Sequence, residues 1–461
     1  MSAPLSPEDS ALVAEEAGMN GDVATSHSDP RSLFQSANVT SESSLRTAIS
    51  QFNPSHGSEI VLALSALRNN RHATSEMIEY TIDAFTGGGV RELNLLIHNA
   101  CYIDEQVAFL IDKYPSAVEY LEDYEYDGVT HGQTSHLLME LFTPAVISDN
   151  VALVVWDKLL DQHREFLCHV RMIYGFTPLH MTAIHKTARS TDFCRNLLQT
   201  LPELLSAQDV QGLRPFERAC ATGNRDVIAL ILESNPTVVV EHNLTDSGPP
   251  VLFGVLFLEV FDDNVALFVL DNLLRSSEPE IVRNAKSSDG HNLLQYAAVA
   301  NDIATGRIVE ICSAVIYAFP SFLYEQDLHG LTPLHNACNE LNLTFAKCVM
   351  DNCPEVFHER SSRGITPITY IFTEQNLTEN PNETIEFTRY LLEVDPSVAS
   401  DLRRSTYPLT HVCMFTEEPY LNAGLEVIKL LYDAYPQVLI IQELVVRRLI
   451  ENERIINAVA S

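Results

Sequence analysis

The segment DLHGLTPLHNAC at residues 327–338 has a close second copy, DVQGLRPFERAC, at residues 209–220. Two shorter copies, GFTPLH at residues 175–180 and GITPIT at residues 364–369, keep the glycine and the proline. Fainter copies are IHNAC at 97–101, GQTSHL at 132–137, GPPVL at 248–252, GHNLLQYA at 290–297 and YPLTHVC at 407–413. Four clear copies are too many for coincidence, so the chain is predicted to consist of repeated units.

The spacing of the copies indicates the type of repeat. The proline of each copy, or the residue aligned with it, lies at positions 96, 135, 178, 215, 250, 293, 333, 367 and 408, which makes eight steps with a mean of 39 residues. A period in this range is typical of stacked supersecondary units, because one such unit cannot bury its apolar face alone. We therefore expect about nine or ten repeats, over residues 45–440.

Local signals within one unit predict two helices and a turn. Gly330 supplies the positive φ that a tight turn needs, Thr332 is a plausible N-cap, and Pro333 fits the first turn of a helix. An apolar helical stretch then ends at a proline followed by an apolar pair, as in LLQTLPELL at residues 197–205. Each unit is thus predicted as turn, helix, helix and connector, in an all-α solenoid.

These units resemble ankyrin repeats, and the best match runs from Gly212 to Leu232, including the interhelix link ACATGN at residues 219–224. The resemblance covers roughly residues 50–440. Ankyrin units are about 33 residues long, whereas these are longer, so the chain is similar to a divergent, long-unit branch of the family. The extra residues are expected between or within the paired helices. A HEAT or TPR solenoid is the alternative fold, but those repeats lack the Thr-Pro-Leu-His start.

Composition excludes several kinds of partner. The chain has 29 basic and 62 acidic residues and a formal net charge of −33, which repels nucleic acid and anionic lipid. The longest apolar run, Val251–Leu258, is far shorter than the ~20 residues that span a bilayer. Neither nucleic acid nor membrane is expected as a partner. The acidic N-terminus does not match an export signal, so a cytoplasmic or nuclear location is expected, with the nine cysteines reduced.

Histidines and cysteines recur at fixed positions of the repeat. The histidines lie two residues after the proline position, at His98, His180 and His335. The resemblance to ankyrin repeats implies that they join adjacent turns by hydrogen bonds. The cysteines lie five residues after it, at Cys101, Cys220, Cys338 and Cys413. Free cysteine packs as a small hydrophobe, so these are predicted to be buried.

No other cluster predicts chemistry. His163, Cys168 and His169 are the nearest approach to a metal-ligand set, but their spacing does not place them together on one helix face. The three glycines at 87–89 follow an apolar stretch and lack the residues of a phosphate loop, so they are predicted to end a helix. We therefore expect no metal, no cofactor and no enzymatic activity.

The two ends of the chain differ from the repeats. Residues 1–44 are rich in serine, alanine and acidic residues, and are predicted to form a disordered acidic tail. Residues 441–461 include the amphipathic stretch QELVVRRLI, which is predicted to form a helix that caps the array.

The predicted function is that of a scaffold or adaptor that binds a partner protein through turn tips and exposed positions of the first helices. By resemblance to ankyrin proteins, the candidate contact residues are Gln211, Arg214, Arg218, His329 and Asn336. The alternative is a substrate-recruiting or regulatory subunit of an enzyme complex, such as a ubiquitin ligase or kinase assembly. The sequence leaves the partner and the oligomeric state open.

Overall fold

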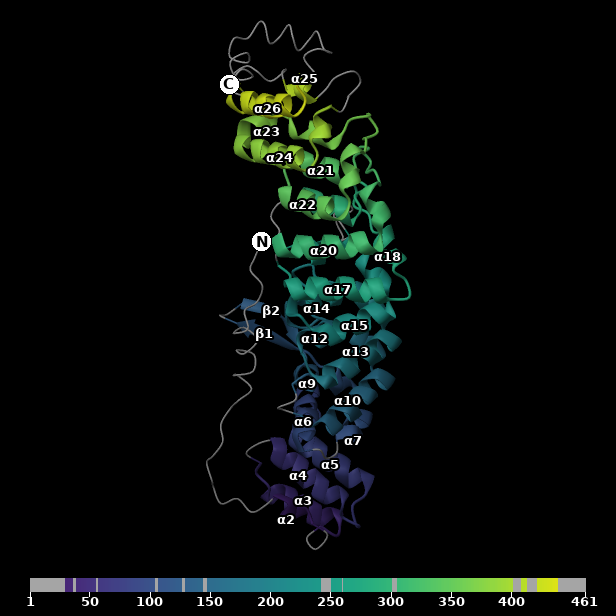
Figure 1. The fold of residues 1–461 in the computed structure, drawn as a ribbon. Coiled ribbons are helices and arrows are strands. Elements are labelled where there is room, and N and C mark those ends of the chain that lie inside the picture. The colour runs from purple at the N-terminus through teal and green to yellow at the C-terminus, as the bar shows by residue number, and fades with distance from the viewer. Residues whose placement is uncertain are drawn as a thin grey trace. The chain divides into compact units, whose positions relative to one another are not determined.

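A computed structural model describes residues 30–35, 39–54, 57–103, 107–126, 129–143, 147–241, 250–258, 260–300, 305–400, 408–412 and 421–437. The chain divides into two compact parts, Met1–Ile231 and Leu232–Ser461, which we call the N-terminal half and the C-terminal half and describe separately. Helical elements dominate both halves (Figure 1).

The N-terminal half contains short paired helices and one hairpin. Its elements are α2 (Pro30–Phe34), α3 (Glu42–Gln51), α4 (Gly57–Arg68), α5 (Ser75–Thr86), α6 (Val90–Ile103), α7 (Val107–Lys113), α8 (Pro115–Val118), β1 (Glu122–Tyr126), β2 (Val129–Thr134), α9 (His136–Leu141), α10 (Asp149–Gln162), α11 (Arg164–His169), η1 (Ile173–Gly175), α12 (Pro178–Ile184), α13 (Ala188–Thr200), η2 (Pro202–Ser206), α14 (Pro215–Thr222) and most of α15 (Arg225–Ser234).

The C-terminal half continues the pattern. Its elements are η3 (Pro236–Val239), α16 (Val251–Phe257), α17 (Asp263–Arg275), α18 (Glu280–Asn284), α19 (Leu293–Val299), α20 (Thr305–Ala318), η4 (Pro320–Leu323), α21 (Pro333–Asn339), α22 (Leu343–Asn352), η5 (Pro354–His358), η6 (Pro367–Ile371), α23 (Glu374–Glu379), α24 (Pro381–Val394), η7 (Pro396–Ser400), α25 (Pro408–Val412) and α26 (Leu421–Ala434).

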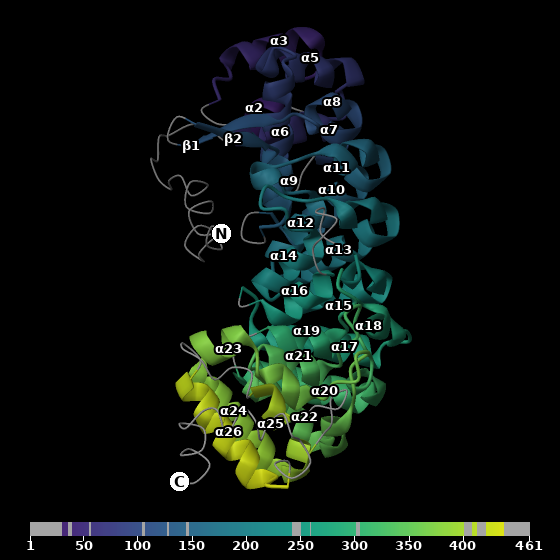
Figure 2. The ribbon, with the colours of Figure 1, turned by 90° about the horizontal axis from the view of Figure 1, so that it is seen from above.

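The helices stack in two layers within each half. The first helices of successive units pack on one another, α12 on α14 in the N-terminal half and α19 on α21 in the C-terminal half. The longer second helices pack likewise, α10 on α13 and, further along the chain, α17 on α20 and α20 on α22 (Figure 2). Apolar side chains fill the space between the layers, as expected for units that bury their faces against neighbours. The predicted helical repeat fold is confirmed.

The helix-ending prolines do more than the sequence predicted. Several of them end the second helix and also open a short helix, as Pro202 does for η2 and Pro354 for η5. The apolar pair that follows is buried, at Leu204 and Leu205 in η2. This additional helical turn occupies the start of the predicted connector.

One unit departs from the all-α pattern. Strands β1 and β2 form an antiparallel two-stranded sheet between α8 and α9, with Tyr126 opposite Val129 and a register irregularity between Asp123 and Glu125. The stretch GQTSHL, which was aligned with the repeat start, therefore spans the end of β2, the N-cap Ser135 and the start of α9.

Most, but not all, of the predicted register corresponds to helix starts. Pro178, Pro215 and Pro333 are each the first residue of a helix. Position 96 is the exception, since Leu96 lies well inside α6, which begins after the glycines at 87–89. Gly87 caps α5 in the left-handed conformation (φ 61°), as predicted for a helix end. The predicted insertion between paired helices is observed as α23.

The described structure begins before the expected edge of the array. Helix α2 and the start of α3 precede residue 45, and Phe34 and Val39 are fully buried with Ala63 and Leu67. A few apolar side chains suffice to dock this segment because α4 offers them an apolar face. Residues 1–29 and the predicted capping helix at 441–461 lie outside the described residues.

Candidate functional site

The turns that start at Asp209 and Asp327 share one shape, which is set by the aspartate. Asp209 donates its amide to the carbonyl of Leu213 (3.0 Å), and its Oδ1 accepts from the amides of Gln211 (2.8 Å) and Leu213 (3.1 Å). Asp327 makes the same bonds in its own turn, with Leu331 and His329. The turns are therefore rigid loops whose tips are held by their own side chains.

Neighbouring turns are joined by backbone hydrogen bonds. In the N-terminal half, the amide of Val210 donates to the carbonyl of Tyr174 (2.9 Å). In the C-terminal half, the amide of Leu328 donates to Asp289 (3.1 Å), and the amide of Ser362 donates to Gly330 (2.9 Å). The tips thus form an ordered row in each half, and we call these residues the turn row.

Two of the predicted structural histidines bind the next turn. His180 Nε2 lies 3.0 Å from the carbonyl oxygen of Leu213, and His335 Nε2 lies 2.8 Å from that of Ile365. Burial lowers the pKa of each imidazole to about 4, although the carbonyl contact opposes this shift. Their predicted role is confirmed. His98 differs: it lies in the middle of α6 and contacts the carboxylate of Glu140 at 2.5 Å.

The candidate contact residues fall into two groups. Gln211 and His329 are exposed at turn tips. Arg214, Arg218 and Asn336 are only about one-twentieth exposed, which corrects the expectation that they lie on the surface.

Two buried members of this set, Arg218 and Asn336, bind the side chains of their own turns. Arg218 forms an ion pair with the buried Asp209 and bonds Gln211 (3.0 Å), while its guanidinium lies over the ring of Phe176. Asn336 donates to Asp327 Oδ2 at 3.0 Å. These residues point back at the aspartate of their own turn, so they stabilise the turn and are not available at the surface.

The sequence reasoning missed the most exposed apolar side chains of the turn row. Val210 is 70% exposed and Leu328 is 76% exposed, and both follow the turn aspartate directly. Tyr174, beside Val210, is 38% exposed. A signal was present, since both full copies of the repeat start carry an apolar residue at a position where a turn is usually polar.

Two buried arginines that join adjacent units were also missed. Arg189 donates to the carbonyls of Leu141 (3.0 Å) and Ile147 (2.7 Å) and pairs with Asp149. Arg307 repeats this arrangement in the C-terminal half, with the carbonyls of Leu258 and Phe261 and the carboxylate of Asp263. The acidic partners begin identical segments, DNVAL at residues 149–153 and at 263–267, and this identity could have indicated the duplicated contact.

Asparagines make a second kind of link between units. Asn224 Nδ2 donates to the carbonyls of Thr182 (3.1 Å) and Ala183 (3.2 Å), at the end of the preceding first helix. Asn342 does the same to Ala297 and Ala298. Each amide satisfies carbonyls that the end of a helix leaves without an intrahelical partner.

The cysteines and the suspected metal-ligand set are now placed. Three of the four register cysteines, Cys101, Cys220 and Cys338, are buried as predicted, and burial raises the pKa of each thiol. Cys413 lies outside the described residues. His163 contacts Glu119 (2.9 Å), whereas Cys168 contacts Glu203 (3.6 Å). Within the described ranges, no three metal-ligating side chains come together.

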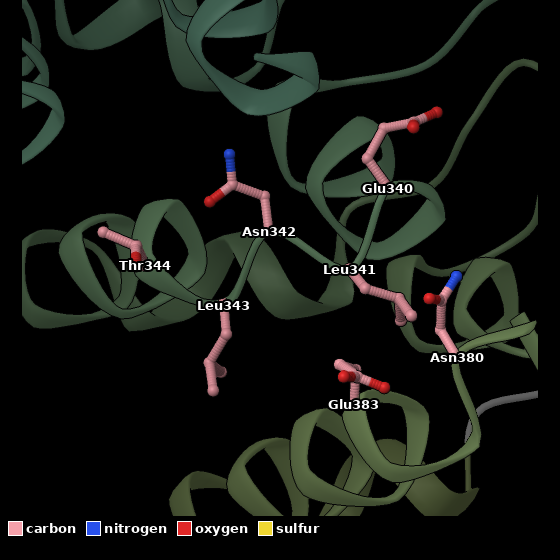
Figure 3. A pocket seen from close by; sticks show the side chains of 7 residues that line it. All are labelled: Glu340, Leu341, Asn342, Leu343, Thr344, Asn380 and Glu383. Atoms are coloured by element: carbon pink, nitrogen blue, oxygen red, sulfur yellow. The ribbon is translucent and has the colours of Figure 1, made fainter. Parts of the chain in front are cut away.

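A depression of about 360 Å³ lies in the C-terminal half, between the α21–α22 link and the start of α24 (Figure 3). Leu341, in the left-handed region at φ 57°, points toward Asn380 and Glu383, whereas Asn342 points away from them. Its lining contains no histidine, cysteine or lysine. Its ionisable side chains are the carboxylates of Glu340 and Glu383.

The turn row, the interlocked histidines and the paired helices define a helical repeat protein with a row of projecting turns in each half. No protein-family model matches the chain, and no curated protein sequence matches it. Among solved structures, the chain is similar to the ankyrin repeat domain of Bcl-3, described as a unique member of the IkappaB protein family, with a TM-score of 0.36 and 14% identity. The alignment covers 56% of this chain and 98% of that chain. Because this TM-score and identity are low, the fold is assigned from the arrangement of the paired helices and turns and not from this similarity.

Helix length and polarity add one finding. Among the described residues, no helix is both long enough and apolar enough to cross a membrane.

Proposed function

We propose that the chain is a divergent ankyrin-type repeat protein that binds a partner protein through its turn row. The observation that carries this proposal is the exposure of Val210 (70%) and Leu328 (76%) on turns that are otherwise held rigidly. Large apolar side chains on rigid tips lose little conformational entropy on binding, so burying them against a partner yields a net gain.

The rigidity of the tips supports the same proposal. Both tips are held at their base by a buried aspartate, and each is joined by a backbone hydrogen bond to the preceding turn. A surface that is already ordered does not need to be rearranged by its partner. Gln211 and His329, exposed beside the apolar tips, then serve as polar contacts at the rim.

Charge favours one class of partner. The formal net charge of −33 attracts basic protein surfaces at long range and repels acidic ones. The proposal therefore includes a partner with a basic surface around an apolar patch. A substrate-recruiting or regulatory role in an enzyme complex is compatible with the same surface, and the identity of the partner distinguishes it from a plain scaffold.

The test is proximity labelling in the native cell, followed by binding measurements with the purified partner. We expect Val210→Asp and Leu328→Asp each to weaken binding at least tenfold, with unchanged circular dichroism and thermal melting. Tyr317→Asp is the matched control, because Tyr317 is 92% exposed but lies on α20, outside the turn row. Equal affinity of all three variants for the partner would refute binding through the turns.

A further inference from the structure

Cys348, in the C-terminal half, lies where two packed helices bring polar groups next to a thiol. Cys348 lies on α22, and its Sγ is 3.7 Å from the carbonyl oxygen of Val309 and 3.7 Å from Ser313 Oγ, both on α20. Residues three and four positions apart share one face of a helix. Cys312 lies three residues after Val309 and directly before Ser313, so it belongs to the face of α20 that Cys348 touches.

The thiols of Cys312 and Cys348 contact each other in the buried interface between α20 and α22. Cys312 is fully buried and Cys348 is 4% exposed, beside Val309, which is 39% exposed. A hydrogen bond from Cys312 lowers the pKa of Cys348 to about 7, against the effect of burial. Burial raises the pKa of the control thiols Cys220 and Cys338. The Cys348 thiol is therefore expected to ionise more readily than those of Cys220 and Cys338, and the thiolate is the form that reacts with peroxide.

We propose that Cys348 is a site of oxidation by hydrogen peroxide, and that Cys312 resolves the product as an intramolecular disulfide. The Cys348 thiolate attacks one peroxide oxygen, the O–O bond breaks, and the departing hydroxide takes a proton to become water. The Cys312 sulfur then attacks the sulfur of the Cys348 sulfenic acid. The S–S bond forms, the S–O bond breaks, and the departing hydroxide takes the Cys312 proton to become a second water.

The disulfide would join the second helices of two successive units, α20 and α22, which already pack together. Closing this loop restricts the unfolded chain and stabilises the helix pair. The same bond fixes the spacing of two units that flank the turn carrying Leu328. Oxidation is thus expected to stiffen the array without changing its fold.

The experiment treats the full-length reduced chain with hydrogen peroxide at pH 7, blocks the remaining thiols, and identifies cross-linked peptides by mass spectrometry. We expect a Cys312–Cys348 disulfide to form at least about tenfold faster than oxidation of Cys220 or Cys338, because the neighbouring Cys312 lowers the pKa of Cys348 and can capture its sulfenic acid, whereas burial raises the pKa of the other two thiols. In Cys312→Ser, Cys348 is expected to accumulate as a sulfenic acid that dimedone traps. In Cys348→Ser, Cys312 is expected to remain reduced.

Two results would overturn the proposal. One is oxidation of Cys348 no faster than that of Cys338. The other is loss of the Cys348 thiol without a Cys312–Cys348 peptide, in a chain that circular dichroism shows to be folded. Cys338→Ser serves as the matched variant, since it removes a buried thiol of the same half and should leave the disulfide yield unchanged.

Discussion

The Nε2 atom of His335 lies 2.8 Å from the carbonyl oxygen of Ile365, which belongs to the next turn of the C-terminal half. Nδ1 of the same ring lies 3.3 Å from the amide nitrogen of Thr332 and 2.6 Å from its hydroxyl. Nε2 therefore donates and Nδ1 accepts, which requires a neutral ring. In the preceding unit Gln295 takes the same position, with its amide donating to Leu331 (3.0 Å) and its carbonyl oxygen accepting from Asn292 (2.8 Å).

This neutral, buried histidine predicts a loss of stability in mild acid. The folded-state pKa of His335 is about 4, below the ordinary value of 6.5, so the unfolded chain binds its proton first. The free energy of unfolding is therefore expected to fall as the pH drops from 6.5 toward 4, by about 1.4 kcal/mol per pH unit for this residue. Urea unfolding followed by circular dichroism at pH 7, 6 and 5 measures the slope.

The control is His335→Gln, which copies the arrangement of Gln295. This variant should keep the hydrogen bonds and lose the titrating group, so its stability should fall less steeply with acid than that of the natural chain. Identical slopes for both chains would show that His335 does not contribute to the pH dependence.

Removing the arginine that joins two units should destabilise the N-terminal half. Arg189→Met leaves the buried carbonyls of Leu141 and Ile147 without their donor, at a cost of about 2–4 kcal/mol. The ion pair adds little, because the Asp149 side chain is 76% exposed. The single tryptophan, Trp156, stacks on Phe193 in the same half, so its fluorescence reports this transition.

Arg195→Met is the comparison variant for that experiment. Arg195 pairs with Asp192 on the surface of the same helix, α13, and its side chain is 49% exposed. We expect a change within about 0.5 kcal/mol. Equal effects of the two substitutions would mean that the carbonyl contacts of Arg189 do not matter for stability.

Two glycines with the same backbone conformation should respond differently to alanine. Gly330 and Gly364 have φ values of 77° and 71°, so a side chain at either costs about 1–2 kcal/mol. A Cβ at Gly330 would in addition clash with the side chain of Ser362, whereas nothing lies within 4 Å of one at Gly364. Thermal melting should therefore be lowered more by Gly330→Ala than by Gly364→Ala.

A second substitution tests the cause of that difference. Adding Ser362→Gly to Gly330→Ala removes the clashing side chain and should recover part of the lost stability. No recovery would argue against contact between the two turns.

Enlarging a small residue of the first-helix layer should also destabilise the chain. Ala337 is fully buried on α21, which packs against α19 and η6. Ala337→Leu is expected to cost about 1–3 kcal/mol through overpacking, measured by chemical denaturation. Ala318→Leu adds the same atoms at an exposed position and should be nearly neutral; an unchanged midpoint for Ala337→Leu would contradict tight packing of this layer.

The sequence alone determined the unit of this protein: the turn glycine, the helix that starts at Pro333 and the buried register cysteines. Each of these signals acts over a few residues, through a positive φ, a missing amide or the size of a side chain, and so can be read from consecutive letters.

Only the tertiary structure decided which side chains reach the surface. Arg218 and Asn336 turned inward to Asp209 and Asp327, while Val210 and Leu328 remained exposed. The tertiary structure also shows three features that the sequence did not predict. They are the links made by Arg189 and Arg307, the β1–β2 hairpin and the Cys312–Cys348 contact. The contacts made by Arg189, Arg307 and Cys312 join residues about one repeat apart, and because the repeats vary in length, spacing in the sequence does not predict which side chains meet.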